Sequence, residues 1–585
     1  MEILQDLPNK LLNGFKAVLD MKCEDYVDLY HTSKAHIYNM IHPFVHQYET
    51  KYQNLVNQYH LDTFDQVVLS LFAVLVLYKI VKSIQRFVEF IFSDKERSFK
   101  AYIFYLLVTY LPFAKKKLEA DLAKVETQFY EACCKNTEKR CPKLPAKGMK
   151  SSTLQKRIQE WVQRDEQISG TGKISGSRYC DDTEYENEIK NFTKDFLYHN
   201  PLHYEIFPAT RQMEAEIIKM TCNMFGSDDG YGYTTSGGTE SILMAVLAHR
   251  NYAAKFRNVT EPNLVMSRTA HPAFNKACKY FKIKCIRVGT NDKAEVDLKQ
   301  LESRIDSNTI MIVGSVPSYP YGVIDDIPAL AKIAKAHKIG LHVDCCLGGF
   351  VVAFAKDYGL QIKPFDFTVD GVTSISCDHH KYALAPKGIS VVMFKTKELR
   401  HQTYTSVSDW PGGFYATPSV CGSKPGAPIA GAWYAMMYHG REGYVEKSKA
   451  ISTATQAIVK AIRELPELQE LDVIGNPCTC SLAIIYKKET KRNIYHLEGA
   501  LSKLGWKFSG IQLPPAIQIS MNHGIANRTK ELIKDLKNCV KDVAENPEKY
   551  KDSSSASMYG ASVKVPDIKT LDRVLDAVVD SFLKL

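Results

Sequence analysis

The sequence predicts an α/β fold with a mostly parallel central sheet and helices on both faces. Between about residues 200 and 395, short apolar β-branched runs alternate with segments of helical periodicity. This alternation is typical of strands joined by helical crossovers. Glycine-rich and polar motifs stand at several of the strand ends, where folds of this kind bind ligands.

The elements follow one another in a regular order. Helices are predicted at 214–223, from residue 240, and at 272–281, 298–304 and 327–337. Strands are predicted at 263–267, 284–289, 309–315 and 339–344, from residue 372, and at 389–395. After Gly431 a long helix and then smaller helix and strand units predict a second, smaller C-terminal α+β domain.

The composition excludes several classes of protein. The 585 residues carry a net charge of +10, but no Lys/Arg run with interleaved aromatic residues indicates a nucleic-acid partner. The excess charge fits an anionic membrane surface or a phosphorylated substrate. The 15 Cys residues lack the spacing of a disulfide scaffold or of a structural zinc site, so we predict free thiols and no metal.

The most apolar stretch, Gln66 to Val81, predicts a transmembrane anchor; the alternative is a buried core helix. Charge asymmetry favours the anchor, because basic residues follow the stretch and acidic residues precede it. The basic residues are Lys79, Lys82, Arg86, Lys95, Arg97 and Lys100, and the acidic ones are Asp62 and Asp65. The rest of the chain would then face the cytosol. Residues 101–113 indicate an interfacial helix, and a second span there would invert this topology.

These features divide the chain into five parts. The predicted parts are a lumenal-side segment (1–60), the anchor (61–82), a basic juxtamembrane segment and linker (83–170), a large domain (171–435) and a small domain (436–585). A Pro/Lys/Gly/Ser-rich break at 141–152 is the best linker and separates the membrane part from the soluble part.

A polar turn between the last two predicted strands of the large domain ends in Lys381, directly after His379 and His380. Burial would remove solvation from the Lys381 amine and lower its pKa, which suits condensation with an aldehyde. Taken alone, a Lys after a strand is more often an ordinary surface residue.

The segment TTSGGTES, residues 234–241, opens a helix and indicates an anion site. Gly237 and Gly238 allow close approach of the backbone, and Ser236 and Thr239 add hydroxyl groups. It is not a Walker loop, because no Lys follows it. The alternative is a flexible turn with a helix cap.

Two further residues stand at strand–helix junctions. Asp344 ends a strand and could pair with a protonated ring nitrogen, although a helix cap or a surface turn is the alternative. His271 could stack on an aromatic ring, although a lone His is more often structural. An anion site, a ring partner, a stacking ring and a Lys together match the needs of pyridoxal phosphate, and the joint pattern is far more specific than any member.

The motifs that carry these residues resemble a known family. They are TTSGGTES, TAHPAFNKA, LHVDCCLGGF and ISCDHHKYALAPKG. They resemble fold-type I pyridoxal-phosphate enzymes of the group II decarboxylase branch, and more closely the sphingosine-1-phosphate lyase family. Further similarities are NPLHYEIFPATRQMEAEI, SGSRY, YPYGVIDD, DWPGGFYATPSVCGSKPG and MYGAS. The resemblance covers roughly residues 171–562.

The resemblance implies a role for each matching residue. Lys381 would bind the cofactor covalently, Asp344 would bind the pyridine nitrogen, and His271 would stack on the ring. The cofactor phosphate would be held by Gly237, Gly238, Thr239, His380 and, from the partner subunit of a homodimer, Ser423. Substrate-phosphate binding or proton transfer would fall to Tyr179, His203 and Lys387. Less specific aromatic positions are Tyr319, Tyr321 and Tyr559.

The sequence departs from the family pattern at four positions. His379 stands where the lyases usually have Thr, Ala383 where they have Gly, and Lys424 where they have Arg, while Pro272 replaces a small residue. No catalytic group is lost. The departures concern substrate preference and turnover more than reaction class.

The resemblance implies cleavage of a phosphorylated long-chain base, such as sphingosine 1-phosphate, into a fatty aldehyde and phosphoethanolamine. It also implies a single-pass protein of the endoplasmic reticulum membrane with its catalytic domain in the cytosol. Two alternatives are an amino-acid decarboxylase on the same fold and a catalytically silent membrane-bound scaffold. Lys387 and the predicted anchor count against the first, and the intact Lys381, Asp344 and His271 against the second.

Overall fold

The computed structural model describes residues 143–490, 492–550 and 568–583, residue 141, and isolated positions between 113 and 131. The predicted anchor at 61–82, residues 101–112 and Tyr559 lie outside the described residues. Within the described part of the chain, no helix is long and apolar enough to cross a membrane.

The chain divides into two units, which are described separately. One unit comprises Met1–Cys133 and Pro566–Lys584, and the other comprises Cys134–Val565 with Leu585. In the first unit, helix α20 (Ile568–Leu583) is amphipathic, and the Ser581 hydroxyl donates to the carbonyls of Ala577 and Glu126. The fold and the candidate site belong to the second unit.

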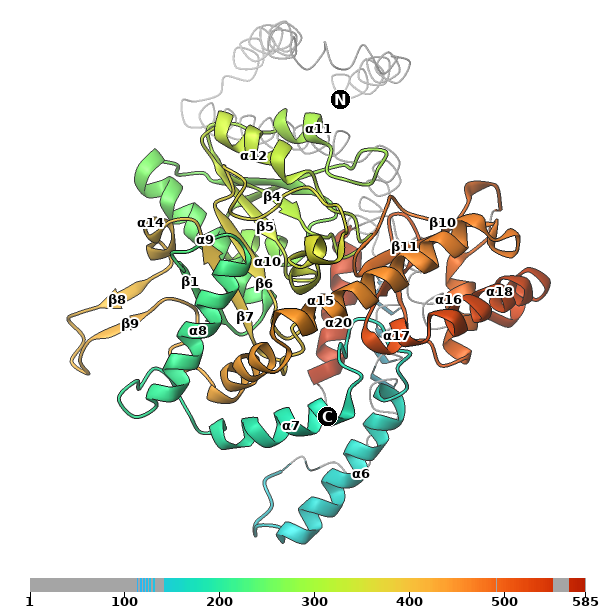
Figure 1. Cartoon of the computed structure of the whole chain (residues 1–585), viewed down its shortest axis with the longest axis horizontal. Helices are drawn as coiled ribbons and strands as arrows, with labels where there is room; N and C mark the ends of the chain where they lie inside the picture. Colours follow the sequence, from blue (N-terminus) through green and yellow to red (C-terminus); the bar gives the residue numbers. More distant parts are fainter. Residues whose placement is uncertain are drawn as a thin grey trace, which may run out of the picture. The chain divides into compact units, whose positions relative to one another are not determined.

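A seven-stranded sheet forms the centre of the second unit, in the order β1-β7-β6-β5-β4-β2-β3 (Figure 1). The strands are β1 (Gly232–Thr235), β2 (Asn263–Ser267), β3 (Lys284–Val288), β4 (Thr309–Ser315), β5 (Gly340–Asp344), β6 (Ser374–Cys377) and β7 (Ser390–Phe394). Only β7 runs antiparallel to its neighbours, so the predicted mostly parallel sheet is confirmed. Strand β1 is absent from the predicted elements, because its sequence GYTT lies within a glycine-rich segment that resembles a turn.

Helices cover both faces of this sheet because side chains of a strand alternate between the faces. Along β4, Ile312 packs in the cluster that contains Ile327 and Leu330 of α12, whereas Met311 and Val313 pack with the apolar face of α9. The helices of this part are α7 (Thr183–Thr193), α8 (Pro208–Met224), α9 (Gly238–Arg257), α10 (Ala273–Phe281), α11 (Leu298–Glu302), α12 (Ile327–Ala336), α13 (Gly349–Val352) and α14 (Lys397–His401), with the 3-10 turns η1 (Lys194–Phe196) and η2 (Ala355–Tyr358).

A second sheet is antiparallel throughout, in the order β10-β11-β13-β12, and lies beside the first (Figure 1). Its strands are β10 (Leu471–Val473), β11 (Ser481–Tyr486), β12 (Ser509–Ile511) and β13 (Ala516–Ser520), and its helices and 3-10 turns are α16 (Ile494–Lys503), α17 (His523–Asn527), α18 (Thr529–Glu545), η3 (Pro466–Leu468), η4 (Lys488–Thr490) and η5 (Pro547–Tyr550). Trp506 is fully buried there, and its Nε1 donates to Asp535 Oδ2 at 2.8 Å.

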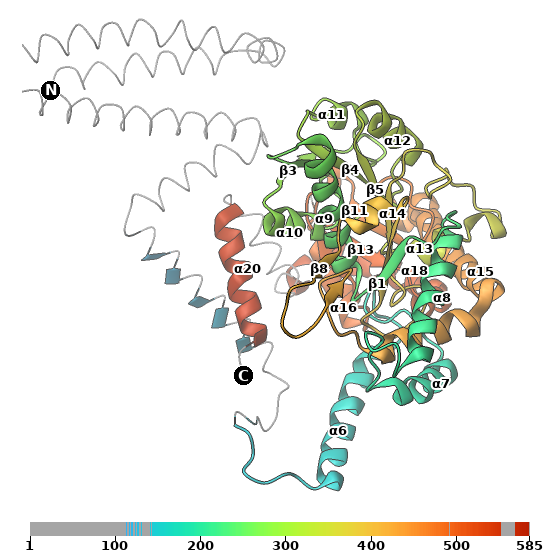
Figure 2. The same cartoon turned by 90° about the vertical axis from the view of Figure 1, so that its left-hand side faces the viewer.

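The long helix α15 (Gly426–Glu464) connects the two sheets and contacts elements of both. The predicted domain boundary at 435/436 falls inside it, and the boundary itself stays a prediction. The predicted break at 141–152 ends within the first two residues of α6 (Ser151–Ser169), which Figure 2 labels. This helix has no buried residues. A short hairpin of β8 (Thr405–Val407) and β9 (Tyr415–Thr417) leads into α15.

Candidate active site

Three parallel strands bring the predicted residues to one edge of the central sheet. Strands β4, β5 and β6 are neighbours, and their registers pair Ser315 with Asp344 and Asp344 with Ser376. The turn after β6 carries Asp378 and Lys381, and the chain then returns through antiparallel β7. Parallel strands all end at the same edge, so Asp344 and Lys381 converge although they are 37 positions apart in the sequence.

Two neighbouring cavities, of about 180 and 380 Å³, share the lining residues His271, Cys346 and Lys381. The first is also lined by Gly176, Tyr179, Ser315, Pro317, Tyr319, Asp344 and Leu347. The second is also lined by Ser236, Gly237, Gly238, Thr239, Glu240, Ile242, Asp378 and His380. The Lys381 side chain therefore faces both the carboxylate of Asp344 and the predicted anion site.

The anion site is the turn between β1 and the N-terminus of α9. Gly237 has φ 155° and ψ 173°, a conformation that residues with a side chain rarely adopt. At Gly238 a Cβ atom would lie 2.7 Å from both carboxylate oxygens of Asp378. Glycine is therefore required for close packing here, which disfavours the alternative of a merely flexible turn.

Ser236 does not contribute the free hydroxyl that the sequence indicates. Its hydroxyl and its backbone N–H both donate to Glu240 Oε2, at 2.6 and 2.7 Å. The carboxylate of Glu240 thus closes the first turn of α9, and its other oxygen accepts from the Val420 N–H at 3.3 Å. Thr239 remains as a hydroxyl-bearing residue that lines the cavity.

Asp344 is buried at the end of β5, with 8% of its surface exposed. Its Oδ1 accepts from the Cys346 N–H at 3.0 Å and from the Ser376 hydroxyl at 3.4 Å. The next helix, α13, has Gly348 as its N-cap, so neither a helix cap nor a surface turn describes Asp344. Two donors on one oxygen orient the carboxylate toward the first cavity.

His271 reaches both cavities from the loop before α10. Its Nδ1 accepts from the Ala273 N–H at 3.1 Å, which places the ring proton on Nε2. Burial lowers the pKa of His271 and the Lys381 charge lowers it further, against the opposing effect of Asp344. The ring is therefore neutral at neutral pH and can lie against an aromatic ligand.

The predicted fall in the pKa of Lys381 is wrong for the protein without its cofactor. Burial is the largest single effect and lowers the pKa of the amine, but Asp378, Cys346 and Tyr179 together outweigh it and hold the pKa above its ordinary value. Lys381 Nζ lies 2.8 Å from Asp378 Oδ2. Asp378 and Cys346 are absent from the predicted site; the only sequence signal for Asp378 is a carboxylate three positions before the Lys.

The second His of the motif supports the anion site, and the first does not. His380 Nδ1 accepts from the Ile389 N–H at 3.2 Å, and its Nε2 lies 3.5 Å from Asp378 Oδ2. His379 is fully buried below the turn, where its Nε2 is 2.9 Å from the Thr221 hydroxyl. The departure at His379 therefore changes core packing and leaves the cavity lining intact.

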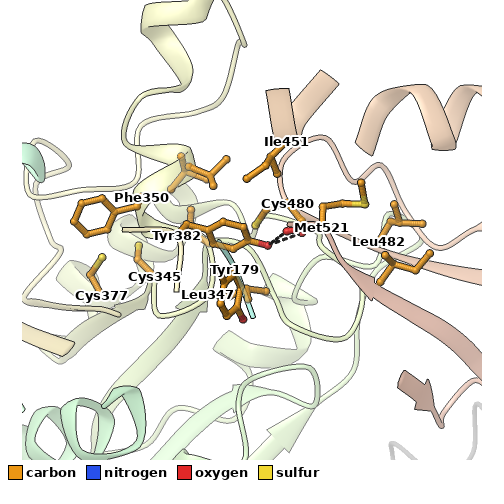
Figure 3. Packing of buried hydrophobic residues seen from close by; sticks show 14 of the residues in the cluster. Tyr179, Cys345, Leu347, Phe350, Cys377, Tyr382, Ile451, Cys480, Leu482 and Met521 are labelled. Atoms are coloured by element: carbon orange, nitrogen blue, oxygen red, sulfur yellow. Dashed lines mark hydrogen bonds between the residues drawn. The ribbon is translucent and has the colours of Figure 1, made fainter. Parts of the chain in front are cut away.

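Two of the predicted substrate residues, Tyr179 and Lys387, contact each other; Tyr179 lines the first cavity, and Lys387 lines neither cavity. Tyr179 is buried, and its ring packs edge-on against Tyr382 with centroids 4.8 Å apart (Figure 3). Lys387 Nζ lies 4.9 Å from the centre of the Tyr179 ring and donates to the His380 carbonyl at 3.2 Å. Burial lowers the pKa of Lys387, and repulsion from Lys381 adds to this effect.

The remaining predicted residues do not all reach the cavities. Tyr319 lines the first cavity, whereas Tyr321 is buried elsewhere and donates to the Leu513 carbonyl at 2.7 Å. His203 and Ser423 are exposed and line neither cavity, and the Ser423 hydroxyl accepts from Asn200 Nδ2 at 3.0 Å.

Comparison with known proteins places this site in a class. The family model of the pyridoxal-dependent decarboxylase conserved domain matches residues 190–473. A Lactobacillus brevis CGMCC 1306 glutamate decarboxylase, 21% identical, covers 71% of this chain and 97% of its own with a TM-score of 0.60, which shows the fold alone. Fold and cavities together define a pyridoxal-phosphate-dependent enzyme of the decarboxylase-type α/β fold.

Proteins with higher sequence identity to this chain show which family within this class it belongs to. The chain is 36% identical to sphingosine-1-phosphate lyase 1 of Mus musculus over 91% of this chain and 92% of that protein. It is 36% identical to the sphingosine-1-phosphate lyase of Saccharomyces cerevisiae over 81% of both chains. A Burkholderia pseudomallei K96243 sphingosine-1-phosphate lyase structure, 32% identical, covers 71% of this chain and 96% of its own with a TM-score of 0.67. The chain belongs to the sphingosine-1-phosphate lyase family.

The residues at the two cavities fit pyridoxal phosphate. The amine of Lys381 lies between a buried carboxylate at Asp344 and a glycine turn at a helix N-terminus. These three groups match the aldehyde, the ring nitrogen and the phosphate of the cofactor. The neutral ring of His271 offers a flat surface beside them.

Gly238→Ala tests the glycine turn. The added Cβ would collide with Asp378 and Cys346, and we expect about tenfold weaker cofactor binding, since over-packing costs roughly 1–3 kcal/mol. Spectroscopic titration with pyridoxal phosphate measures the effect. Gly148→Ala is the matched control, because a Cβ there meets nothing within 4 Å. Equal affinity in the two variants would contradict the assignment.

Proposed function

We propose that this chain cleaves phosphorylated sphingoid bases, such as sphingosine 1-phosphate, into a long-chain aldehyde and phosphoethanolamine. One observation carries the proposal: Lys381 lies where a cavity lined by Asp344 and Tyr179 joins a cavity lined by the glycine turn. Membership of the sphingosine-1-phosphate lyase family supports the choice of substrate.

The cofactor residues have separate tasks in this proposal. Pyridoxal phosphate supplies a ring that takes up the electron pair of the breaking carbon–carbon bond. Lys381 binds the cofactor aldehyde, Asp344 keeps the ring nitrogen protonated, and His271 stacks on the ring. The phosphate is held by Gly237, Gly238, Thr239 and His380, and by Ser423 from a second subunit.

The substrate phosphate is assigned to Lys387, with Tyr179 and His203 as assisting residues. A phosphate near the Lys387 ammonium forms charge-assisted hydrogen bonds, which favour the protonated amine over the neutral form that burial favours. Burial raises the pKa of Tyr179, so its hydroxyl keeps its proton at neutral pH and acts as a donor. Tyr319 and the C-terminal Tyr559 are further candidates for substrate contact.

Two alternatives share the fold. An amino-acid decarboxylase is the function that the broader family model suggests. It is disfavoured because the more similar relatives are lyases, at 36% identity over most of the chain. A silent scaffold is disfavoured by the intact set of Lys381, Asp344 and His271 at one site.

Lys381→Ala separates these functions. Purified protein with pyridoxal phosphate is expected to show a visible absorption band and to release aldehyde from a phosphorylated long-chain base. The variant loses both, because no amine remains to bind the cofactor covalently. Mass spectrometry of products and a carbon dioxide assay are the measurements, and Lys356→Ala, at an exposed position, is the control. Carbon dioxide release without aldehyde would point to the decarboxylase.

We also infer that the enzyme is a homodimer. Exposed apolar side chains surround the β8–β9 hairpin and the loop after it, with exposed fractions of 57% at Trp410, 91% at Phe414 and 66% at Val420. Apolar surface of this kind favours association. Ser423 follows in the same loop and lies outside its own subunit's cavities, which fits a role in the partner's site.

Mixing two inactive variants tests the shared site. Lys381→Ala and Ser423→Ala each damage a different part of one composite site, so a mixed dimer carries one intact site and one doubly altered site. After subunit exchange we expect activity to recover to about a quarter of wild type, since half of the dimers are mixed. No recovery, with exchange verified by mass, would contradict a shared site.

The membrane assignment rests on the sequence. We infer a single span at 61–82 in the endoplasmic reticulum membrane with the catalytic domain in the cytosol. The apolar run and the basic residues that follow it support this topology. An anchor keeps the enzyme close to an amphiphilic substrate that partitions into lipid.

Leu71→Asp combined with Leu75→Asp tests the anchor in the full chain. Two carboxylates in the span cost several kcal/mol of insertion energy, so we expect the protein to move from the carbonate-washed membrane pellet to the supernatant. In sealed vesicles with their cytosolic side outward, protease is expected to digest the wild-type catalytic domain. Protection of that domain would contradict the topology.

A further inference from the structure

Asp378 is the closest charged neighbour of the Lys381 amine, and no predicted role accounts for it. The carboxylate is 3% exposed, directly after strand β6, and its Oδ2 lies 2.8 Å from Lys381 Nζ and 3.5 Å from His380 Nε2. A buried ion pair of this kind is costly to desolvate and marks a place where charge is needed.

The second oxygen of Asp378 has no hydrogen-bond partner among the described residues, although it is buried. Both oxygens face Gly238, the first residue of α9, where a Cβ would approach them to 2.7 Å. The positive end of this helix stabilises the carboxylate. Burial is the largest single effect and raises the pKa of Asp378, but the charges of Lys381 and His380 and the hydrogen bonds to the carboxylate together hold the pKa below its ordinary value. Asp378 is therefore ionised.

We propose that Asp378 is a positioning residue for cofactor attachment, which holds the Lys381 amine as an ammonium between the two cavities and so slows the formation of a bond between this nitrogen and the cofactor aldehyde. The inference rests on the proposed function. One ammonium proton first leaves to solvent, and the Asp378 charge makes this loss harder. The neutral Lys381 nitrogen then forms a bond to the aldehyde carbon, and the carbonyl oxygen leaves as water with the two remaining protons, so atoms and charge balance.

Other titratable groups surround the same amine. They are His380 and Cys377 on its own turn and strand, Lys387 after the turn, Asp344 at the end of β5, Cys346 after β5, Tyr179 before α7, His271 before α10 and Cys480 before β11. Of all the groups that raise the pKa of the amine, Asp378 contributes most, ahead of Cys346 and Tyr179. Replacing the Asp378 charge therefore isolates the effect.

The test follows cofactor attachment rather than turnover. Full-length protein is freed of cofactor and mixed with pyridoxal phosphate at a series of pH values. The rate at which the visible absorption band appears is recorded. The adduct on the Lys381 peptide is trapped with borohydride and quantified by mass spectrometry. In wild type the rate is expected to rise throughout the neutral and mildly alkaline range, because only the neutral amine reacts.

Asp378→Asn is expected to move this profile to lower pH. Each unit of lowered amine pKa gives about tenfold more neutral amine at pH 7, so attachment there becomes at least about tenfold faster. Asp378→Glu keeps the charge and is expected to keep the wild-type midpoint with a lower maximal rate. Glu470→Gln, which removes the partner of Arg492 in the second sheet, is the control with an unchanged profile.

Three outcomes overturn the inference. One is an Asp378→Asn profile that superimposes on wild type in a variant with wild-type thermal unfolding. Another is a wild-type attachment rate that stops rising with pH below pH 7. This outcome is measured on the wild-type protein, so it does not depend on whether a variant folds. The third, no adduct on Lys381 in wild type at any pH, contradicts the proposed function as well, so the two failures are distinguishable.

Discussion

The parallel pairing of β4, β5 and β6 is the constraint on which the site depends. Its register sets Asp344 between Ser315 and Ser376, and it fixes where the turn after β6 begins. A slip of one residue would reverse the face of every side chain in a strand. The buried apolar side chains on both faces of the sheet hold this register, so the core and the site are determined together.

The edge of the sheet gathers several buried charges, which normally destabilise a fold. Lys381 pairs with Asp378, and the N-terminus of α9 adds a favourable dipole to that carboxylate. The Oδ1 of Asp344 instead accepts two hydrogen bonds, and within the part of the chain that the structure describes Asp344 forms no ion pair. The two carboxylates therefore have different environments, which suits one for holding the amine and the other for a ring nitrogen.

The similarity to decarboxylases and lyases has a physical basis in this arrangement. The amine, the carboxylate and the glycine turn belong to the sheet edge and are independent of the substrate. The proposed substrate residues Lys387 and Tyr179 lie outside this set and contact each other beside it. A shared fold is thus compatible with different reactions, and the site residues decide between them.

The sequence by itself predicted the strands β2 to β7 and the glycine turn, and it singled out Lys381, Asp344 and His271, which line one cavity and whose roles stay predictions. These features leave local signals, because a strand needs a continuous apolar run and a helix N-terminus needs a particular turn. Only the tertiary structure decided that Asp378 binds the Lys381 amine, that Ser236 is engaged by Glu240, and that Tyr319 rather than Tyr321 reaches the cavity. The tertiary structure also decided the pairing of β1 with β7, because the paired residues Thr235 and Ser390 are 155 positions apart in the sequence. Contacts between distant segments, and the pKa values that follow from them, depend on sheet register and burial, which no local pattern records.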